Sequence, residues 1–526
     1  MIRNHLKFAV ALMGALLAAA CGGGSDGSSP TATVSNADGR AVALSVAAPV
    51  ALGDTRSANF GPPLWQVRYA PGRDAVGLLT VDDERRVFAG GKAPSYAGAP
   101  NGWLVRAHDA RTGRQLWQDA FFGANPDSNK VQTIVAATGR VYAGGFASAT
   151  ANTTVAMVRA YNAATGAPLW EDRFGAAGFF ASVTSLALDR SARKEDDDRL
   201  PSGLLYATGR ALRPDFKTEW IVRAYDALTG AIRWQDTLDV TRFNDAVSVA
   251  AVDGRVITAG FTSDASALSR HFTVRSYDGG TGALLWQDRL PNGVNRFYGG
   301  DAAVQVAIDG DRVVAVGQSS DAAGENFTVR TYDTQSGRLI WQDQFTTGSG
   351  ADEAASVAIR NGRAFVAGFG GAACSLDNVS DCDWIVRTYS LQTGALLWSR
   401  QIDGIAHSDN SASVVLACDD RVIVAGTAGT DRNDVFADAL VQQLDAQTGR
   451  LTREDRLTVP GRYASPLGLA VAGNRLFVST TVLDFTETTN DPYVLLRAFR
   501  LRDAGADDEM GEEHGCRPLG NNAFFF

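Results

Sequence analysis

The chain has 526 residues, of which 45% are apolar and 20% are charged, and it contains 55 glycines. This composition is typical of a large all-β protein with many turns. Its formal net charge of −9 argues against nucleic acid and against an anionic membrane surface as partners.

The N-terminal segment carries an export signal. Arg3 and Lys7 precede an apolar run that ends at Ala20 and is too short for a permanent membrane-spanning helix. Cys21 and a Gly/Ser stretch follow, a pattern that resembles a bacterial lipoprotein leader. The resemblance implies a signal peptide over 1–20, lipidation of Cys21 and an outer-membrane anchor in the cell envelope, on either the periplasmic or the surface side. A plain secretory leader cleaved near Ala20 is the alternative.

The two ends of the mature chain differ from its middle. Residues 21–58 are rich in Gly, Ser, Thr, Ala and Pro. This composition predicts a flexible tether that holds the body roughly 30–35 Å from its anchor. Within it, Ala41 to Leu52 is apolar enough to form an isolated strand. The polar and acidic segment 503–526 is expected to be a mobile or loosely docked tail.

Residues 59–502 consist of repeats. The stretch from Arg223 to Asp236, RAYDALTGAIRWQD, reads as a β-hairpin whose polar turn contains Asp226, Thr229 and Gly230. Near-copies of this stretch recur along the chain, each marked by a tryptophan. These are Trp65, Trp117, Trp170, Trp234, Trp286, Trp341 and Trp398, with Arg453 in the eighth position.

Each repeat contains four strand-like runs, which is the pattern of a propeller blade. Three such runs follow Arg453 without a fourth, whereas Leu64 to Tyr69 reads as a fourth strand without three before it. The sequence therefore predicts an all-β, eight-bladed β-propeller with four-stranded antiparallel blades, closed by the N-terminal strand. A seven-bladed ring with the last repeat packed outside it is the alternative.

The repeat AxDxxTGxxxW resembles the tryptophan-docking repeat of pyrroloquinoline-quinone (PQQ)-type propellers over about residues 60 to 500. That superfamily includes quinoprotein alcohol dehydrogenases and BamB, a lipoprotein of outer-membrane barrel assembly. The resemblance implies that each Trp packs between neighbouring blades and that the repeat itself carries no catalytic group.

An arginine stands 11 residues before the Trp in six copies: Arg106, Arg159, Arg223, Arg275, Arg330 and Arg387. Counting across the hairpin places Arg223 close to Trp234, so we predict a cation–π contact of about 0.5–1 kcal/mol. The competing interpretation is a salt bridge from Arg223 to Asp236 in the same hairpin. The two degraded copies favour the first interpretation, because Arg is kept where Trp is kept.

Short and long connections alternate along the chain. The turns between strands one and two and between strands three and four are short, and in a propeller they lie on one face. The opposite face, which we call the long-loop face, receives connections such as 263–271, 292–300, 371–383 and 427–437. We predict that this face is the binding surface, because loops carry function more often than the scaffold does.

Several blades place an aspartate just before the innermost strand, which would form an acidic ring around the channel mouth. These residues are Asp74, Asp245, Asp301, Asp352 and Asp409, with Asp127 as a weaker match. Such a ring would suit a cation or a basic peptide. The competing interpretation is that each Asp caps the turn entering its own strand. Aromatic residues of the same loops could line a groove or pack onto the blade tops: Phe122, Phe179, Phe180, Phe243, Phe297 and Tyr298.

The cysteines suggest an oxidising compartment. Cys374 and Cys382 lie in one long loop, and in an exported protein they are expected to form a local disulfide. The sequence leaves open whether Cys418 and Cys516 pair. The acidic run Glu195 to Asp198 is predicted to be a solvated loop.

No catalytic motif stands out. The sequence has no His spacing typical of metal sites, no CxxCH haem motif and no GxSxG elbow. Quinoprotein dehydrogenases typically use an adjacent Cys pair and calcium ligands beside PQQ, and neither is matched here. We therefore predict a monomeric, non-catalytic, lipid-anchored scaffold, without PQQ or calcium, that binds a protein partner in the envelope. A periplasmic PQQ-dependent oxidoreductase and a glycan or surface-ligand binder are the alternatives.

Overall fold

The computed structural model describes most of the ring. The described residues are 33–36, 41–43, 58–69, 77–82, 86–93, 102–123, 128–137, 139–150, 153–175, 179–189, 203–239, 242–264, 270–290, 301–321, 324–348, 351–371, 374, 382–402, 410–430, 436–483 and 493–501. Every regular element among them is a β-strand.

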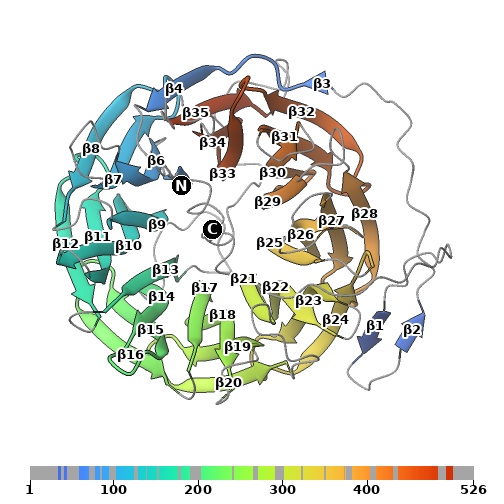
Figure 1. Ribbon diagram of the computed structural model, residues 1–526, viewed down its shortest axis with the longest axis horizontal. Helices are drawn as coiled ribbons and strands as arrows, with labels where there is room; N and C mark the ends of the chain where they lie inside the picture. The colour runs from blue at the N-terminus through green and yellow to red at the C-terminus, as the bar shows by residue number, and fades with distance from the viewer. Residues whose placement is uncertain are drawn as a thin grey trace.

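The strands form blades arranged around a central axis (Figure 1). In each blade the first strand is innermost and the fourth is outermost, and neighbours in sequence pair antiparallel. The first four blades contain β5 (Leu78–Val81), β6 (Arg86–Ala93), β7 (Gly102–Asp109) and β8 (Gln115–Phe121); β9 (Lys130–Ala137), β10 (Arg140–Thr150), β11 (Thr153–Asn162) and β12 (Pro168–Phe174); β13 (Ala181–Leu188), β14 (Leu204–Leu212), β15 (Thr218–Asp226) and β16 (Ile232–Leu238); β17 (Asn244–Val252), β18 (Arg255–Ser263), β19 (Arg270–Asp278) and β20 (Leu284–Arg289).

The second half of the ring repeats this arrangement. Blades 5 to 8 contain β21 (Ala302–Asp309), β22 (Arg312–Ser320), β23 (Glu325–Asp333) and β24 (Leu339–Phe345); β25 (Glu353–Arg360), β26 (Arg363–Gly370), β27 (Asp383–Ser390) and β28 (Leu396–Ile402); β29 (Asn410–Ala417), β30 (Arg421–Gly429), β31 (Ala437–Asp445) and β32 (Leu451–Leu457); β33 (Tyr463–Ala472), β34 (Arg475–Leu483), β35 (Tyr493–Arg500) and β4 (Trp65–Tyr69). The predicted all-β, eight-bladed propeller with four-stranded antiparallel blades is confirmed.

The N-terminal strand closes the ring. β4 pairs antiparallel with β35, with Val67 opposite Leu496 and Trp65 opposite Ala498. Figure 1 shows β4 lying between β35 and the first blade. Because this strand completes the eighth blade, the seven-bladed alternative is not what the chain adopts.

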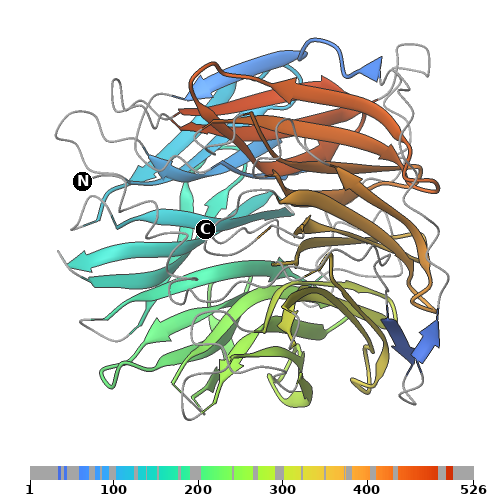
Figure 2. The same ribbon diagram turned by 45° about the vertical axis from the view of Figure 1, so that its right-hand side comes forward.

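The sequence predicts a flexible tether over residues 21–58. The structure has two short strands within this segment and a third at its end. β1 (Thr33–Asn36) pairs antiparallel with β24, the outer strand of blade 5, and with β2 (Ala41–Ala43). β3 (Ala58–Asn59) pairs parallel with β32. Figures 1 and 2 show the β1–β2 hairpin at the outer rim of the ring.

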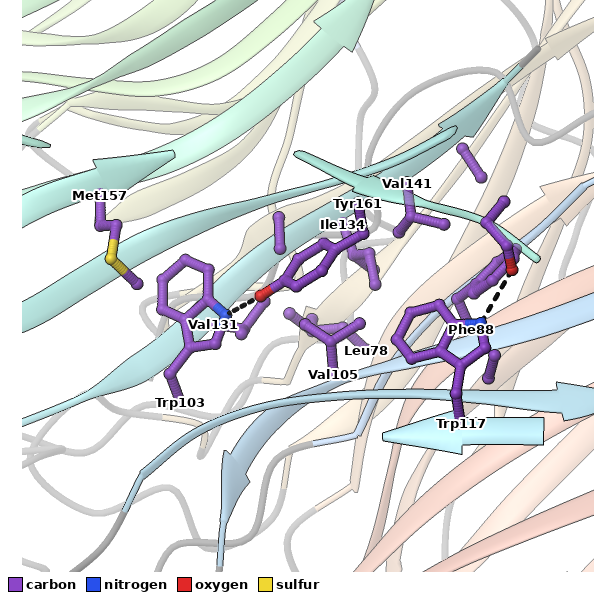
Figure 3. Packing of buried hydrophobic residues seen from close by; sticks show 14 of the residues in the cluster. Leu78, Phe88, Trp103, Val105, Trp117, Val131, Ile134, Val141, Met157 and Tyr161 are labelled. Carbon is purple, nitrogen blue, oxygen red and sulfur yellow. Dashed lines mark hydrogen bonds between the residues drawn. The ribbon is translucent and has the colours of Figure 1, made fainter. Parts of the chain in front are cut away.

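Apolar side chains from facing blades fill the space between them. Between blades 1 and 2, Trp103, Trp117 and Tyr161 pack with aliphatic residues of both blades (Figure 3). The indole N–H of Trp103 donates to the Tyr161 hydroxyl at 2.9 Å, so the polar end of each ring is satisfied although both are buried. The core is therefore a series of inter-blade layers rather than one central mass.

The repeated Asp-x-x-Thr-Gly turn is explained by its hydrogen bonds. Asp226 Oδ1 accepts from the backbone N–H and the hydroxyl of Thr229, at 2.9 and 3.0 Å. Gly230 then takes φ +76°, which a side chain would disfavour. These contacts make the turn between strands three and four short and rigid.

Candidate functional site

The seven repeat tryptophans lie between neighbouring blades. Trp170 Nε1 in blade 2 donates to the Ala227 carbonyl in blade 3 at 3.1 Å, and its ring covers Gly230 so closely that an added Cβ would lie 2.6 Å from it. Each indole N–H donates to the matching carbonyl of the next blade: Trp65 to Ala110, Trp117 to Ala163, Trp170 to Ala227, Trp234 to Gly279, Trp286 to Thr334, Trp341 to Leu391 and Trp398 to Ala446.

The predicted contact between Arg223 and Trp234 is wrong. The strand register pairs Arg223 with Gln235 and Trp234 with Ala224, so the two side chains point to opposite faces of the blade. The competing bridge to Asp236 is wrong as well. Arg223 Nη1 instead meets Asp172 of the preceding blade at 2.5 Å.

This ion pair between neighbouring blades recurs around the ring. At five boundaries the Arg and the Tyr two residues after it both bind the Asp two residues after the preceding blade's Trp, whereas Arg497, which is followed by Phe499, binds Asp455 without a Tyr. Thus Tyr225 Oη also donates to Asp172, at 2.7 Å. Burial and the nearby carboxylate raise the pKa of the Tyr225 phenol, which keeps it a neutral donor. The ion pairs are Asp119–Arg159, Asp172–Arg223, Asp236–Arg275, Asp288–Arg330, Asp343–Arg387 and Asp455–Arg497.

Departures from the repeat compensate for one another across blade boundaries. Where blade 6 has Arg400 in place of the Asp, blade 7 has Gln442 and Leu444 in place of the Arg and Tyr. Where Arg453 replaces the Trp, its Nη1 donates to the Leu501 carbonyl at 3.0 Å, the position that an indole N–H serves elsewhere. The charges of the repeat are therefore part of the scaffold.

The predicted acidic ring is made of two different positions. Asp301 and Asp352 stand one residue before the strand, whereas Asp245 is the second residue of β17. The register of the inner strands aligns Asp245 with Glu353, because Ala246 and Ala354 face Gly260 and Gly368. Asp74, Asp409 and Asp127 lie outside the described residues.

Asp301 and Asp352 cap the chain where it enters the inner strands. Asp301 Oδ1 accepts from the backbone N–H and the hydroxyl of Ser320, both at 2.7 Å. Asp352 accepts from the N–H and hydroxyl of Thr347 at 2.9 and 2.7 Å. Burial raises the pKa of both carboxyls. These contacts support the capping interpretation of the two residues.

Blades 5 and 6 bring together an acidic pair, Glu325 and Glu353, that was not among the residues predicted from the sequence. Glu325 is the first residue of β23 and Glu353 the first of β25, and the Asp352 N–H donates to the Glu325 carbonyl at 3.3 Å. Burial and the charge of Glu325 raise the pKa of Glu353 to about 7. Glu353 could have been found in the sequence because it follows Asp352. Glu325 could not, because it joins the pair only through the contact between blades 5 and 6.

Blades 3 and 4 carry the opposite charge on the same face. Arg210 Nη1 lies 2.7 Å from Asp245 Oδ2. Arg270 lies near both residues: burial, the largest effect, and the charge of Arg210 lower the pKa of the Arg270 guanidinium, whereas the charge of Asp245 raises it. Arg242, which follows β16 in the sequence, is exposed. The long-loop face is thus polarised, with Arg210 and Arg270 on blades 3 and 4 and with Glu325 and Glu353 on blades 5 and 6.

The loop aromatics have mixed roles. Phe180 packs against Phe146 with ring centroids 5.7 Å apart, and Phe179 packs edge-on against Phe216. Arg242 lies 5.3 Å from the Phe243 ring centroid. Phe122 is 46% exposed. Phe297 and Tyr298 lie outside the described residues.

Two cysteine sites are disulfide-bonded. Cys374 and Cys382 are joined, with their Cα atoms 4.7 Å apart, and both are buried. Cys418 is also disulfide-bonded, and its partner lies outside the described residues. Cys21, Cys516 and the run Glu195 to Asp198 are outside the described residues too.

The described residues do not fit the cofactor and calcium ion of quinoproteins. No three His, Cys, Asp or Glu side chains gather into a metal site in the part of the chain that the structure describes. The carboxylates of Asp245, Asp301 and Asp352 are engaged by Arg, Ser and Thr side chains. The five cysteines include no adjacent pair. Among the described residues there is also no helix that is long and apolar enough to cross a membrane.

Solved structures similar to this chain include two enzymes and a protease domain. The quinohemoprotein alcohol dehydrogenase from Comamonas testosteroni is 13% identical, with a TM-score of 0.50, over 84% of this chain and 78% of that chain. That from Pseudomonas putida HK5 is 11% identical, with a TM-score of 0.46, over 87% and 79%. The β-propeller domain of the Trilobed protease from Pyrococcus furiosus is 8% identical, with a TM-score of 0.37, over 84% and 99%. At 13% identity, the likeness to the Comamonas testosteroni enzyme concerns the fold alone.

Sequence comparison with protein families is more specific. No curated protein matches the chain at a significant level. The model of the family described as outer membrane protein assembly factor BamB matches residues 101–197 and 218–491. Because these stretches make up well over half of the 526 residues and carry the repeats that build the blades, the chain belongs to the outer membrane protein assembly factor BamB family.

Proposed function

We propose that this protein is a non-catalytic β-propeller of the bacterial cell envelope, anchored through a lipid on Cys21, that binds a protein partner through its long-loop face. The family description, an outer membrane protein assembly factor, supports this role. The leader that ends at Cys21 supports the anchor, and the tether would let the ring reach a partner at the membrane.

One observation carries the proposal: the charges on the long-loop face are separated by sign. Arg, Asp and Tyr of the repeat are engaged between blades, as for Arg223 with Asp172. On the long-loop face, blades 3 and 4 carry Arg210, which is paired with Asp245, and Arg270, while blades 5 and 6 carry Glu325 and Glu353. A face with separated positive and negative areas selects and orients a partner with the complementary pattern.

Exposed apolar residues on the two opposite faces allow a test of which face binds the partner. Phe216, 67% exposed between β14 and β15, lies on the long-loop face, and Leu228, 62% exposed, lies in the turn between β15 and β16. A photo-crosslinking residue at position 216 or at Phe122 is expected to trap the same envelope protein. Position 228 is the matched control and should trap little. Equal trapping of that protein from position 228 contradicts the proposed face.

The enzymatic alternative has its own test. Purified protein is titrated with PQQ and calcium while the quinone absorbance and the melting temperature are followed. We expect neither saturable binding nor a rise in melting temperature. Saturable binding would overturn the non-catalytic proposal.

A further inference from the structure

Two arginines from neighbouring blades lie near one carboxylate on the long-loop face. Arg210, near the end of β14, places Nη1 2.7 Å from Oδ2 of Asp245 in blade 4. Asp245 is 7% exposed, whereas the Arg210 side chain is 41% exposed. The anionic partner is therefore buried while part of the cation still faces solvent.

Arg270, the first residue of β19, adds a second positive charge. Its guanidinium lies 4.4 Å from the centroid of the Phe261 ring, and it interacts electrostatically with both Asp245 and Arg210. Within the described ranges, Arg270 forms no ion pair. Among the described residues, the carboxylate of Asp245 acts on both guanidiniums, so two positive charges face one negative charge there.

Neighbouring acidic residues do not supply that counter-charge. Asp264 is engaged by Arg289 at 2.6 Å and by His271 at 3.0 Å, and Asp239 is engaged by Arg213. In the sequence, the segments that flank these strands have no acidic residue: 240–241 is Val-Thr, 265–269 is ASALS, and 291–300 is PNGVNRFYGG. Among the described residues, positive charge therefore exceeds negative charge at this site.

Aromatic rings support both guanidiniums. Phe180 lies 5.5 Å from the Arg210 guanidinium, and Phe261 supports Arg270. Cation–π contact uses the face of a guanidinium and leaves its N–H edge for an acceptor in the plane. A carboxylate suits such an edge because its two oxygens accept paired hydrogen bonds from the fork.

The matching position in the next blade has the opposite charge. Arg270 and Glu325 are both the first residue of a third strand, opposite Ser263 and Ser320. Glu325 makes the neighbouring region acidic, and the whole chain carries −9. A long polyanion would be repelled by this surrounding charge, whereas a short acidic segment would fit between the two arginines.

We infer that Arg270 and Arg210 form a binding subsite for a carboxylate of a short acidic segment in the protein partner. This subsite rests on the proposed role of the long-loop face. Asp245 occupies part of the subsite in the free protein, so the incoming carboxylate competes with it for the guanidiniums.

The test measures binding of a fluorescein-labelled tetraglutamate peptide by fluorescence anisotropy at low salt. We expect saturable binding that Arg270→Gln weakens about tenfold, as expected for loss of one charge-assisted pair. Arg233→Gln is the matched control, because Arg233 is 54% exposed on the opposite face and paired with Asp226. Asp245→Asn should strengthen binding, because it removes the competing carboxylate, and a purely structural role of this cluster predicts no such gain.

Several results would overturn the subsite: no saturable binding, equal effects of Arg270→Gln and Arg233→Gln, or weaker binding after Asp245→Asn in a variant that melts like the wild type. Competition by inorganic phosphate at the concentration of the peptide would also overturn the assignment to a carboxylate. If crosslinks from position 216 trap the partner but the peptide does not bind, the interaction face stands and the subsite alone fails.

Discussion

Asp172 receives two side chains of the following blade, the guanidinium of Arg223 and the phenol of Tyr225. From the sequence alone, Arg223 is expected to contact Trp234, because the Trp is its near neighbour within a single hairpin. In the folded ring the partner is 51 residues away and in another blade. The same relation explains why Arg400 and Gln442 change together: they occupy the two sides of one boundary.

Glu353 is the residue for which we expect the clearest pH dependence. Its pKa is raised from 4.5 to about 7 in the folded protein, so folding favours the protonated form. The stability that this provides is complete below about pH 4.5 and is lost as the pH rises towards 7.

The variant Glu353→Gln keeps a neutral side chain at every pH. Relative to the wild type, we expect it to gain about 1–2 kcal/mol of unfolding free energy between pH 5 and pH 8, a value reduced because the side chain is only partly buried. Urea unfolding at the two pH values measures this. An identical difference between variant and wild type at both pH values would contradict the assignment.

At the scale of the strand, the inner edge of blades 2 to 8 carries a bulge. In blade 4 the register shifts between Ala246 and Ser248, and the Ser248 hydroxyl then accepts from the Val306 N–H of blade 5 at 3.3 Å. Ser185 and Ser356 make the same contact with the blades that follow them. The bulge thus turns a polar side chain towards the next blade, and edge N–H groups are satisfied around the channel.

The turn between strands three and four joins two blades as well as two strands. Gly230→Ala combines an unfavourable φ of +76° with a Cβ 2.6 Å from the Trp170 ring. Gly254→Ala is the matched control, because its φ is +74° but nothing lies within 4 Å of the added Cβ. We expect a loss of about 1 kcal/mol for Gly254→Ala and about 2–4 kcal/mol for Gly230→Ala, measured by urea unfolding. Equal losses would mean that Trp170 tolerates the added atom.

The whole molecule is held closed by contact between its two ends. β4 and β35 are more than 400 residues apart in sequence, yet they complete one blade, and Trp65 Nε1 donates to the Ala110 carbonyl of blade 1 at 3.1 Å. Ring closure therefore covers the edge of β35 and fills the last inter-blade layer.

Two N-terminal truncations test closure. A variant that begins at residue 58 keeps β4 and is expected to unfold cooperatively as a monomer. A variant that begins at residue 70 lacks β4 and should lose at least about 3 kcal/mol, the cost of removing a packed Trp, and should aggregate through the open edge. Calorimetry and light scattering measure the two effects. Matching results for both variants would show that β4 does not close the ring.

The sequence by itself determined the fold, because Trp, Gly and the Asp-containing turn recur at a spacing that only a four-stranded blade satisfies, and because the unmatched strand Leu64 to Tyr69 had to complete the last blade. It also located the long-loop face. Only the tertiary structure decided which charges belong to the scaffold, since Arg223 meets its Asp in another blade. Only the tertiary structure also decided the electrostatic surroundings of Arg270 and Glu353, because the charged residues that shift their pKa values come from other strands.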